Sequence, residues 1–304
     1  MVSFIILNYN SSNYCLQCVT SINQQLSKVS YEVIVVDNFS HEEDKNYLKR
    51  NLPSDVRLVE SRFNGGFGLG NMLGANVAKG DFLCFINSDI IFVEDCVTPL
   101  ITYMHKHPEV GCITPQQMSS SQERVASFLH NPGLLRELFG NHFLEKLAPK
   151  HFPRQETTDS TPPLQVPQVT GCFMLFPTDV FWAIGGFDTN IFLYCEEYDV
   201  GNRLRTLKKT CMVLPQFCFI HIGAVTTKKV RGNADRERFI SRLYVYRKHH
   251  PLWLSTMYRI VMFLKYLMRP KRWNLLPILF RGEALSRSMR FHACQNTYTS
   301  FKQK

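Results

Sequence analysis

Short apolar runs alternate with helix-forming segments in the N-terminal third of the chain, and this order limits the folds open to it. The apolar runs span residues 2–7, 31–37, 56–61 and 81–87. Apolar residues at helical spacing follow in the segments 14–26, 67–79 and 94–107. Strands that alternate with helices form right-handed βαβ units. We therefore expect an α/β fold with a mostly parallel, twisted sheet flanked by helices.

A proline-rich segment, residues 114–168, interrupts this order. It carries seven prolines between Pro115 and Pro167, together with polar runs. Long segments of this kind within a compact domain are usually functional loops. We expect an excursion with one short helix near 133–147, which serves as a mobile lid over a site. The strand pattern resumes at 169–177.

The charge of this 304-residue chain is unevenly distributed. Residues 1–225 hold 17 lysines and arginines against 22 acids, whereas residues 226–304 hold 18 against three. We therefore expect a first domain of residues 1–225 and a basic helical C-terminal region of residues 226–304. A region of this charge suits an anionic surface, such as membrane lipid, nucleic acid or a phosphorylated substrate.

Residues 249–273 combine bulky apolar side chains with basic ones. Arg259 and Lys265 interrupt the apolar positions, so no uninterrupted membrane span is expected. The pattern favours an interfacial helix that lies on an anionic leaflet. The alternative is an amphipathic helix that packs on the rest of the chain or on a second subunit.

The ten cysteines are scattered singly, without a CxxC pair or a Cys/His cluster at zinc spacing. This usage is typical of buried thiols in a reducing compartment, and it argues against a disulfide framework or a zinc site. The first apolar run is too short for a signal peptide and lacks a basic leader. We expect a cytoplasmic protein.

Polar residues follow the predicted strands where the strands end. In open α/β sheets, ligands bind beyond the carboxyl ends of the strands. Each polar tip alone is consistent with a helix cap or a turn, but their coincidence on one edge favours a binding site. His221 also follows an apolar run, where it is either structural or a metal ligand beside a carboxylate. The tips are Asn8-Tyr9-Asn10, Asp37-Asn38 and Asn87-Ser88-Asp89.

Two further segments carry candidate chemistry. "FNGGFGLGN" (63–71) fails the dinucleotide fingerprint, because Asn71 stands where a glycine is required. It remains either a loop whose N–H groups face an anion or a tight strand–helix turn. "FLYCEEYDVGNRLRT" (192–206) places Glu196, Glu197 and Asp199 among apolar residues. Acids suit a first helical turn, and a carboxylate in a partly apolar cleft also suits a general base.

The chain resembles the inverting, nucleotide-sugar-dependent glycosyltransferases of family 2, which have the GT-A fold. The resemblance covers residues 1 to 225 and is most specific between GGFD and EEYD. Within the family it is similar to the branch of bacterial rhamnosyltransferases and other O-antigen, lipopolysaccharide or cell-wall polysaccharide enzymes. The matching pieces are "IILNYNS" (5–11), "EVIVVDNFS" (32–40), "NGGFGLGNMLGANVAKGDFLCFINSD" (64–89), "GCFMLFPTDVFWAIGGFDTNIFLYCEEYDVGNRL" (171–204) and "HIG" (221–223).

The resemblance implies a role for individual residues. It implies that Asp89 binds Mn²⁺ or Mg²⁺ with His221 as a second contact, in the place of the DxD motif. Glu197 would be the catalytic base, where the family usually has Asp; Glu196 or Asp199 are the alternatives. The nucleotide sugar would be held by Tyr9, Asn10, Asp37, Asn38, Asn64, Gly65, Asn71, Asn87 and Ser88. The sugar and acceptor side would be shaped by Gly186, Phe187 and Asp188.

The resemblance also implies the reaction and its location. Rhamnose or another hexose would pass from a nucleoside-diphosphate sugar to a hydroxyl of a lipid-linked glycan, with inversion. The enzyme would be peripheral to the cytoplasmic face of the inner membrane. Two other hypotheses are a catalytically impaired relative that only binds a sugar nucleotide, and a nucleic-acid-binding protein that uses the basic region. The second leaves the acidic clusters unexplained, so we expect no nucleic-acid partner.

Overall fold

The computed structural model describes residues 1–223, 231–281 and 285–290. The rest of the predicted basic region, residues 226–230, 282–284 and 291–304, lies outside the described residues. The strands are β1 (Val2–Asn8), β2 (Tyr31–Asp37), β3 (Arg57–Glu60), β4 (Phe82–Asn87), β5 (Ile90–Phe92), β6 (Val110–Met118), β7 (Leu164–Val166), β8 (Phe173–Pro177) and β9 (Thr210–His221).

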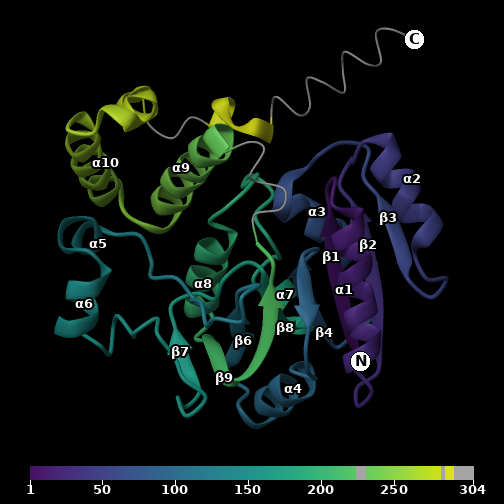
Figure 1. The fold of residues 1–304 in the computed structure, drawn as a ribbon. Coiled ribbons are helices and arrows are strands. Elements are labelled where there is room, and N and C mark those ends of the chain that lie inside the picture. The colour runs from purple at the N-terminus through teal and green to yellow at the C-terminus, as the bar shows by residue number, and fades with distance from the viewer. Residues whose placement is uncertain (224–230, 282–284, 291–304) are drawn as a thin grey trace, which may run out of the picture.

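Helices connect the strands and form the C-terminal part of the described chain (Figure 1). The α-helices are α1 (Ser12–Gln25), α2 (Glu42–Asn51), α3 (Gly66–Ala75), α4 (Val97–Lys106), α5 (Leu134–Phe139), α6 (Asn141–Leu147), α7 (Thr178–Ala183), α8 (Glu196–Thr206), α9 (Arg231–His249), α10 (Leu252–Leu267) and α11 (Leu276–Arg281). Two 3₁₀ turns are η2 (Pro270–Leu275) and η3 (Leu285–Arg287).

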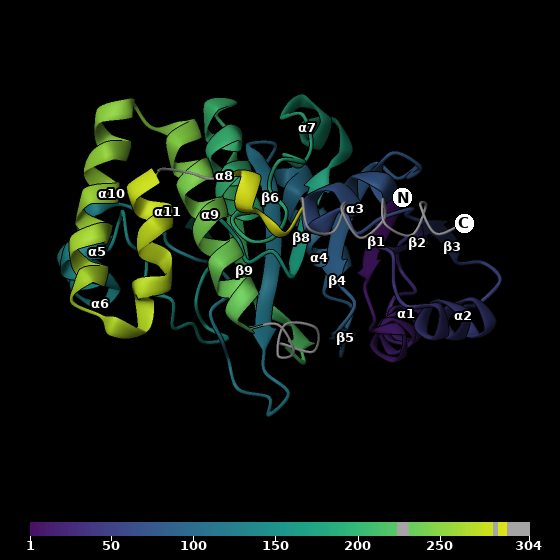
Figure 2. The same ribbon diagram turned by 90° about the horizontal axis from the view of Figure 1, so that it is seen from above.

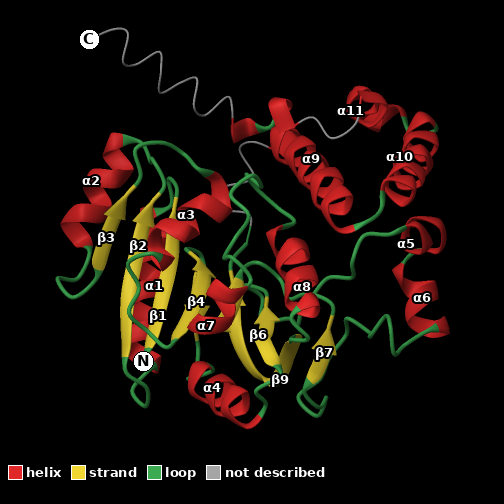
Figure 3. Ribbon diagram, turned by 180° about the vertical axis from the view of Figure 1, so that it is seen from behind, coloured by secondary structure: helices red, strands yellow, loops and turns green. Residues whose placement is uncertain are grey.

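One nine-stranded sheet forms the centre of the molecule, in the order β3-β2-β1-β4-β8-β6-β9-β5, with β7 beside β9 (Figure 3). The strands β3, β2, β1 and β4 run parallel to their neighbours, as does β6 to β9. The pairs β4–β8, β6–β8, β5–β9 and β7–β9 are antiparallel. The predicted parallel, helix-flanked sheet therefore describes the N-terminal half, and the second half is mixed.

The alternation of side chains along β1 sends apolar groups to both faces of the sheet. Phe4 and Ile6 join α1 and α4 in one core, whereas Ile5 joins α3, α7 and α8 in the other. Because both faces are covered, the strand reads as a continuous apolar run. Its carboxyl end, together with the ends of β2 and β4, is left at one rim of the sheet.

The excursion at 114–168 differs from its predicted form. Its first residues belong to β6, where Pro115 lies at an irregularity in the pairing with β9. Proline lacks the N–H that strand pairing requires, but it is tolerated at such irregularities. The prolines of this segment therefore led to the prediction of a loop where β6 forms. The predicted single helix is split into α5 and α6 at Gly140, whose φ is +77°.

The C-terminal helices share a third core with residues that precede them in the chain. Tyr198 of α8 and Ile191 pack in one cluster with α9, α10 and α11. Tyr258 of α10 is fully buried and stacks on Tyr246 of α9, with ring centroids 4.2 Å apart. Within the described ranges, no helix has the length and apolar character needed to cross a membrane.

We predict that Tyr258→Ala lowers the free energy of unfolding by about 3–5 kcal/mol, because it leaves a cavity in the shared core. Chemical denaturation of the full chain measures this change. Phe280→Ala is the matched control, since Phe280 is 78% exposed, and it should change the stability by at most about 0.5 kcal/mol. A loss below about 1 kcal/mol for Tyr258→Ala would show that the C-terminal helices are energetically separate.

Candidate active site

A cavity of about 550 Å³ opens where β1, β4 and β9 end. Its lining includes Asp89 together with Glu196 and Glu197. Of the sequence-predicted residues, the lining also includes Tyr9, Asn38, Asn64, Asn87, Ser88 and His221. The predicted residues that are not part of the lining are Asn10, Asp37, Gly65, Asn71, Gly186, Phe187, Asp188 and Asp199.

Asp89 and His221 meet although 132 residues separate them. The antiparallel pairing of β5 with β9 aligns Ile90 with His221, so His221 Nε2 lies 3.1 Å from Asp89 Oδ1. The other carboxylate oxygen accepts a hydrogen bond from the Gly223 N–H at 3.0 Å. Burial lowers the pKa of His221, but its hydrogen bonds to Asp89 and Cys172 outweigh burial and raise the pKa to about 10.

This pair supplies the kind of donors that a divalent cation takes, but few of them. A carboxylate oxygen and a neutral imidazole nitrogen suit Mn²⁺, so His221 would have to release its proton when the cation binds; carboxylates also suit Mg²⁺. In the described part of the chain, no group of three or more His, Cys, Asp or Glu side chains could hold a metal ion. A cation held by Asp89 and His221 would therefore need phosphate oxygens and water to complete its coordination.

Asn38 holds the glycine loop, residues 64–66, at the edge of the cavity. Its side-chain oxygen accepts a hydrogen bond from the Gly65 N–H at 3.0 Å, and its amide donates to Asn64 Oδ1 and to the Gly66 carbonyl. The Gly65 backbone is thus positioned by Asn38. Tyr9, which directly follows β1, is also part of the lining.

Asp37 and Asn10 lie outside the lining and hydrogen-bond with the loops that follow β1 and β2. Asp37 is buried and accepts hydrogen bonds from the Asn8 side chain and the Ser40 N–H. Asn10 has a φ of +53° and accepts a hydrogen bond from the His41 N–H at 2.8 Å. Asn71 is also buried, and its amide donates to the Phe67 carbonyl in the first turn of α3. These residues fix the loops and do not line the cavity.

The glycine loop touches the loop that carries the acids. Gly66 has a φ of +76°, and a Cβ at this position would lie 2.0 Å from the Phe192 carbonyl oxygen. The next N–H, that of Phe67, donates to the same oxygen at 2.8 Å. Only glycine allows this approach. The contact joins the glycine loop, residues 64–66, to the segment 192–197.

The acids follow a strained turn at the start of α8. Tyr194 and Cys195 have φ values of +69° and +71°, which non-glycine residues rarely adopt. The turn directs Glu196 and Glu197 into the cavity lining. Burial and the neighbouring Glu197 raise the pKa of Glu196 well above its usual range, and its Oε1 has no hydrogen-bond partner. Burial therefore favours the protonated form of Glu196.

Glu197 differs from its neighbour. Burial raises its pKa above the usual range as well, although its own backbone N–H and the Arg238 cation partly offset this effect. No hydrogen bond from another side chain to its carboxylate is found within the described residues. Among the three candidate bases, Glu197 is the one that is both in the cavity and supported by a cation.

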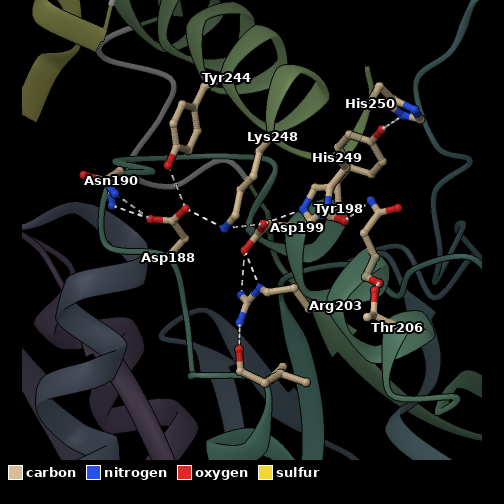
Figure 4. Close-up of polar contacts among 12 residues, drawn as sticks. Asp188, Asn190, Tyr198, Asp199, Arg203, Thr206, Tyr244, Lys248, His249 and His250 are labelled. Atoms are coloured by element: carbon tan, nitrogen blue, oxygen red, sulfur yellow. Dashed lines mark hydrogen bonds and ion pairs between the residues drawn. The ribbon is translucent and has the colours of Figure 1, made fainter. Parts of the chain in front are cut away.

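Asp199 belongs to an ion-pair network outside the cavity (Figure 4). Its carboxylate is fully buried and contacts Arg203 at 2.6 Å, His249 at 2.7 Å and Lys248 at 2.8 Å. Burial opposes ionisation, but these partners outweigh it and lower the pKa to about 2. Lys248 also lies 2.7 Å from Asp188, which accepts a hydrogen bond from Tyr244. Asp188 and Asp199 thus hold α9 in place.

One face of α9 runs along the acid-bearing loop. Arg238, Ser241, Tyr244 and Lys248 recur at helical spacing and contact residues between Asp188 and Asp199. The Arg238 guanidinium lies 4.2 Å from the centre of the Tyr194 ring and is part of the cavity lining. Sequence reasoning missed Arg238, because the charge of residues 226–304 was interpreted as a whole. The helical spacing of 238, 241, 244 and 248 indicates one polar helix face, but it does not show which segment this face contacts.

We predict that Gly66→Ala lowers the free energy of unfolding by about 1–3 kcal/mol or more. The positive φ and the contact with Phe192 both exclude a side chain at this position. Thermal or chemical denaturation measures the change. Gly133→Ala is the control, since a Cβ there meets nothing within 4 Å, and should be neutral. Equal stability of the two variants would contradict the close approach of the two loops.

We predict a pH-dependent loss of stability for Asp199→Asn. The folded pKa of Asp199 is about 2, below its ordinary value of 3.8. Its ionised form therefore stabilises the fold above pH 4, and this contribution disappears as the pH falls through 2. At pH 7 the variant should lose about 3–5 kcal/mol, because Lys248 and Arg203 lose their buried partner. A difference from the native protein that stays constant from pH 7 to about pH 2 would contradict this role.

Comparisons with known proteins agree with this geometry. The N-acetylgalactosaminyltransferase 4 of Drosophila melanogaster is 24% identical over 247 residues, which cover 79% of this chain and 38% of that protein. This chain therefore spans about two fifths of the length of that curated relative. The crystal structure of GalNAc-T7 with UDP, GalNAc and Mn²⁺ has a TM-score of 0.56 at 15% identity and covers 90% of this chain and 57% of that chain.

A mannosyltransferase, PcManGT from Pyrobaculum calidifontis in complex with GDP-Man and Mn²⁺, also has a TM-score of 0.56, at 14% identity, over 92% of this chain and 73% of that chain. These structural likenesses confirm the predicted GT-A fold. The sequence profile described as "Glycosyl transferase family 2" matches residues 3–185, more than half of the chain. The protein belongs to glycosyl transferase family 2.

Proposed function

We propose that this protein transfers a hexosyl group from a nucleoside-diphosphate sugar to an acceptor hydroxyl, with inversion at the anomeric carbon. One observation carries the proposal: the Asp89–His221 pair and the Glu196–Glu197 pair line the same cavity. The first pair suits a diphosphate with its cation, and the second suits the proton transfer at the acceptor. Inversion follows if the acceptor attacks from the face opposite the leaving group in one displacement.

The proposed division of labour follows from the environments of the acids. Glu197 accepts the proton of the attacking hydroxyl, because it is the carboxylate with a nearby cation, Arg238. Glu196, whose protonated form is favoured by burial and by the neighbouring Glu197, donates a hydrogen bond to the sugar or the acceptor. Asn38 and Gly66, which both line the cavity, position the nucleotide.

Asp89 and His221 would hold a divalent cation, Mn²⁺ or Mg²⁺, which neutralises charge on the leaving diphosphate. The donor set fits such an ion, because a carboxylate and an imidazole lie 3.1 Å apart at the cavity wall. The solved structures similar in fold that contain Mn²⁺ together with UDP or GDP-Man support the same proposal.

For the donor and acceptor, we propose rhamnose or another hexose and a lipid-linked glycan of a bacterial surface polysaccharide, such as an O-antigen. The motif resemblance supports this choice; the N-acetylgalactosaminyl and mannosyl relatives show that other sugars suit the fold. A lipid-linked acceptor places the enzyme at the cytoplasmic face of the membrane. Ligand-observed NMR with dTDP-rhamnose, UDP-sugars and GDP-sugars, with and without Mn²⁺, tests the donor. Failure of every donor to bind would overturn the proposal.

We predict that Glu197→Gln and Asp89→Ala each lower kcat by about a hundredfold or more, as the removal of a single electrostatic group does in other sites. Metal-dependent hydrolysis of the donor that binds best provides the assay, since water can replace the acceptor. Both variants should keep the native unfolding transition.

Glu196→Gln is the matched control for this prediction. Glutamine resembles a neutral carboxylic acid in shape, so kcat should fall less than about tenfold if Glu196 is protonated. Near-normal hydrolysis by Glu197→Gln, with loss of hydrolysis in Glu196→Gln, would transfer the role of base to Glu196. Loss of hydrolysis in a stably folded Asp199→Asn variant alone would contradict the assignment of both.

A further inference from the structure

We propose that α5, α6 and α10 together form a surface that binds an anionic lipid bilayer. The proposal rests on the proposed function in one respect, because a lipid-linked acceptor requires the enzyme to work at a membrane. It goes further by identifying the surface and by assigning part of the 114–168 excursion to it.

Helix α10 is apolar on two opposite sides. Tyr258, Met262 and Tyr266 are buried in the third core. On the other side, large apolar residues recur at intervals of four and three and are exposed: Trp253 by 63%, Met257 by 47%, Ile260 by 54%, Leu264 by 56% and Leu267 by 49%. A helix of a soluble domain normally presents polar residues on its outer side. The outer side of α10 therefore lacks the partner that its composition requires.

Helices α5 and α6 also expose apolar residues. Figures 1 and 2 both show them beside α10 at one edge of the molecule. An ion pair of 2.6 Å between Glu137 of α5 and Lys265 of α10 fixes their relative position. Large apolar residues of α5 and α6 are exposed by 50–68%: Leu135, Leu138, Phe139, Phe143 and Leu147. Exposed apolar residues gathered on neighbouring helices indicate an interaction site.

The charge around this surface identifies the occupant. Residues 250–281, which include α10, contain six lysines and arginines and no aspartate or glutamate, whereas α5 and α6 hold two basic and two acidic residues. Arg269, Lys271 and Arg272 are exposed directly after α10, beside Trp273, which is 55% exposed. Basic residues combined with exposed tryptophan and leucine suit the headgroup region of an anionic leaflet. A second copy of the chain would instead place like charges opposite one another.

Vesicle co-sedimentation of the full chain tests the proposal, with phosphatidylcholine vesicles and with equimolar phosphatidylcholine and phosphatidylglycerol. The native protein should bind the anionic vesicles more tightly, and salt should weaken the binding. Ile260→Ser with Leu264→Ser removes apolar contact, and Arg269→Gln with Arg272→Gln removes charge. Phe139→Ser with Phe143→Ser tests the contribution of α5 and α6. Each pair should lower the partition coefficient by roughly tenfold or more.

Val93→Ser with Leu207→Ser is the control, because both residues are exposed by 43% on other parts of the molecule. Donor binding by NMR in every variant shows that the catalytic part is intact and separates this proposal from the proposed function. Absence of binding to anionic vesicles, or unchanged binding by the α10 pairs, would overturn the proposal. Unchanged binding by the Phe139/Phe143 pair would overturn the part assigned to the excursion. Concentration-dependent dimers that the α10 variants abolish would identify a second copy as the occupant instead.

Discussion

The contact between Gly66 and the Phe192 carbonyl is the constraint on which the site depends. It brings the loop after β3 against the loop before α8, although the two lie far apart in the sequence. The glycine loop and the acids Glu196 and Glu197 can therefore line one cavity. Any side chain at position 66 would separate these loops, and the Asp89–His221 pair would then face the acids across a wider and wetter gap.

The acids near position 197 show how environment decides the role of a carboxylate. Glu196 is buried beside an adjacent acid, and both effects raise its pKa and favour its protonated form. Asp199, three residues later, faces Arg203, Lys248 and His249 and remains ionised. Because a helix turns by about 100° per residue, these side chains point to different surroundings. One part of the motif lines the cavity and the other part anchors α9.

The C-terminal helices have two different sides. The inner side of α9 supplies Arg238 to the cavity and Lys248 to the anchoring network, while α10 fills the third core. The basic charge of the region is thus partly committed to ion pairs within the protein, which weakens a nucleic-acid role for it. The outer side of α10 is apolar, and the neighbouring α5 and α6 also expose apolar residues. The membrane proposal and the catalytic proposal therefore concern opposite sides of the same helical layer.

The sequence alone determined the alternation of strands and helices, the strand boundaries of β1, β2 and β4, and the polar strand ends, because buried parallel strands require continuous apolar runs. It also singled out Asp89, His221, Glu196 and Glu197, since polar groups beside apolar runs are conspicuous. Tertiary structure decided the rest. Pairing of β5 with β9 joined Asp89 to His221, and the packing of α9 on the acid-bearing loop introduced Arg238 and separated Asp199 from the cavity. These relations depend on contacts between distant segments, which local composition and periodicity do not encode.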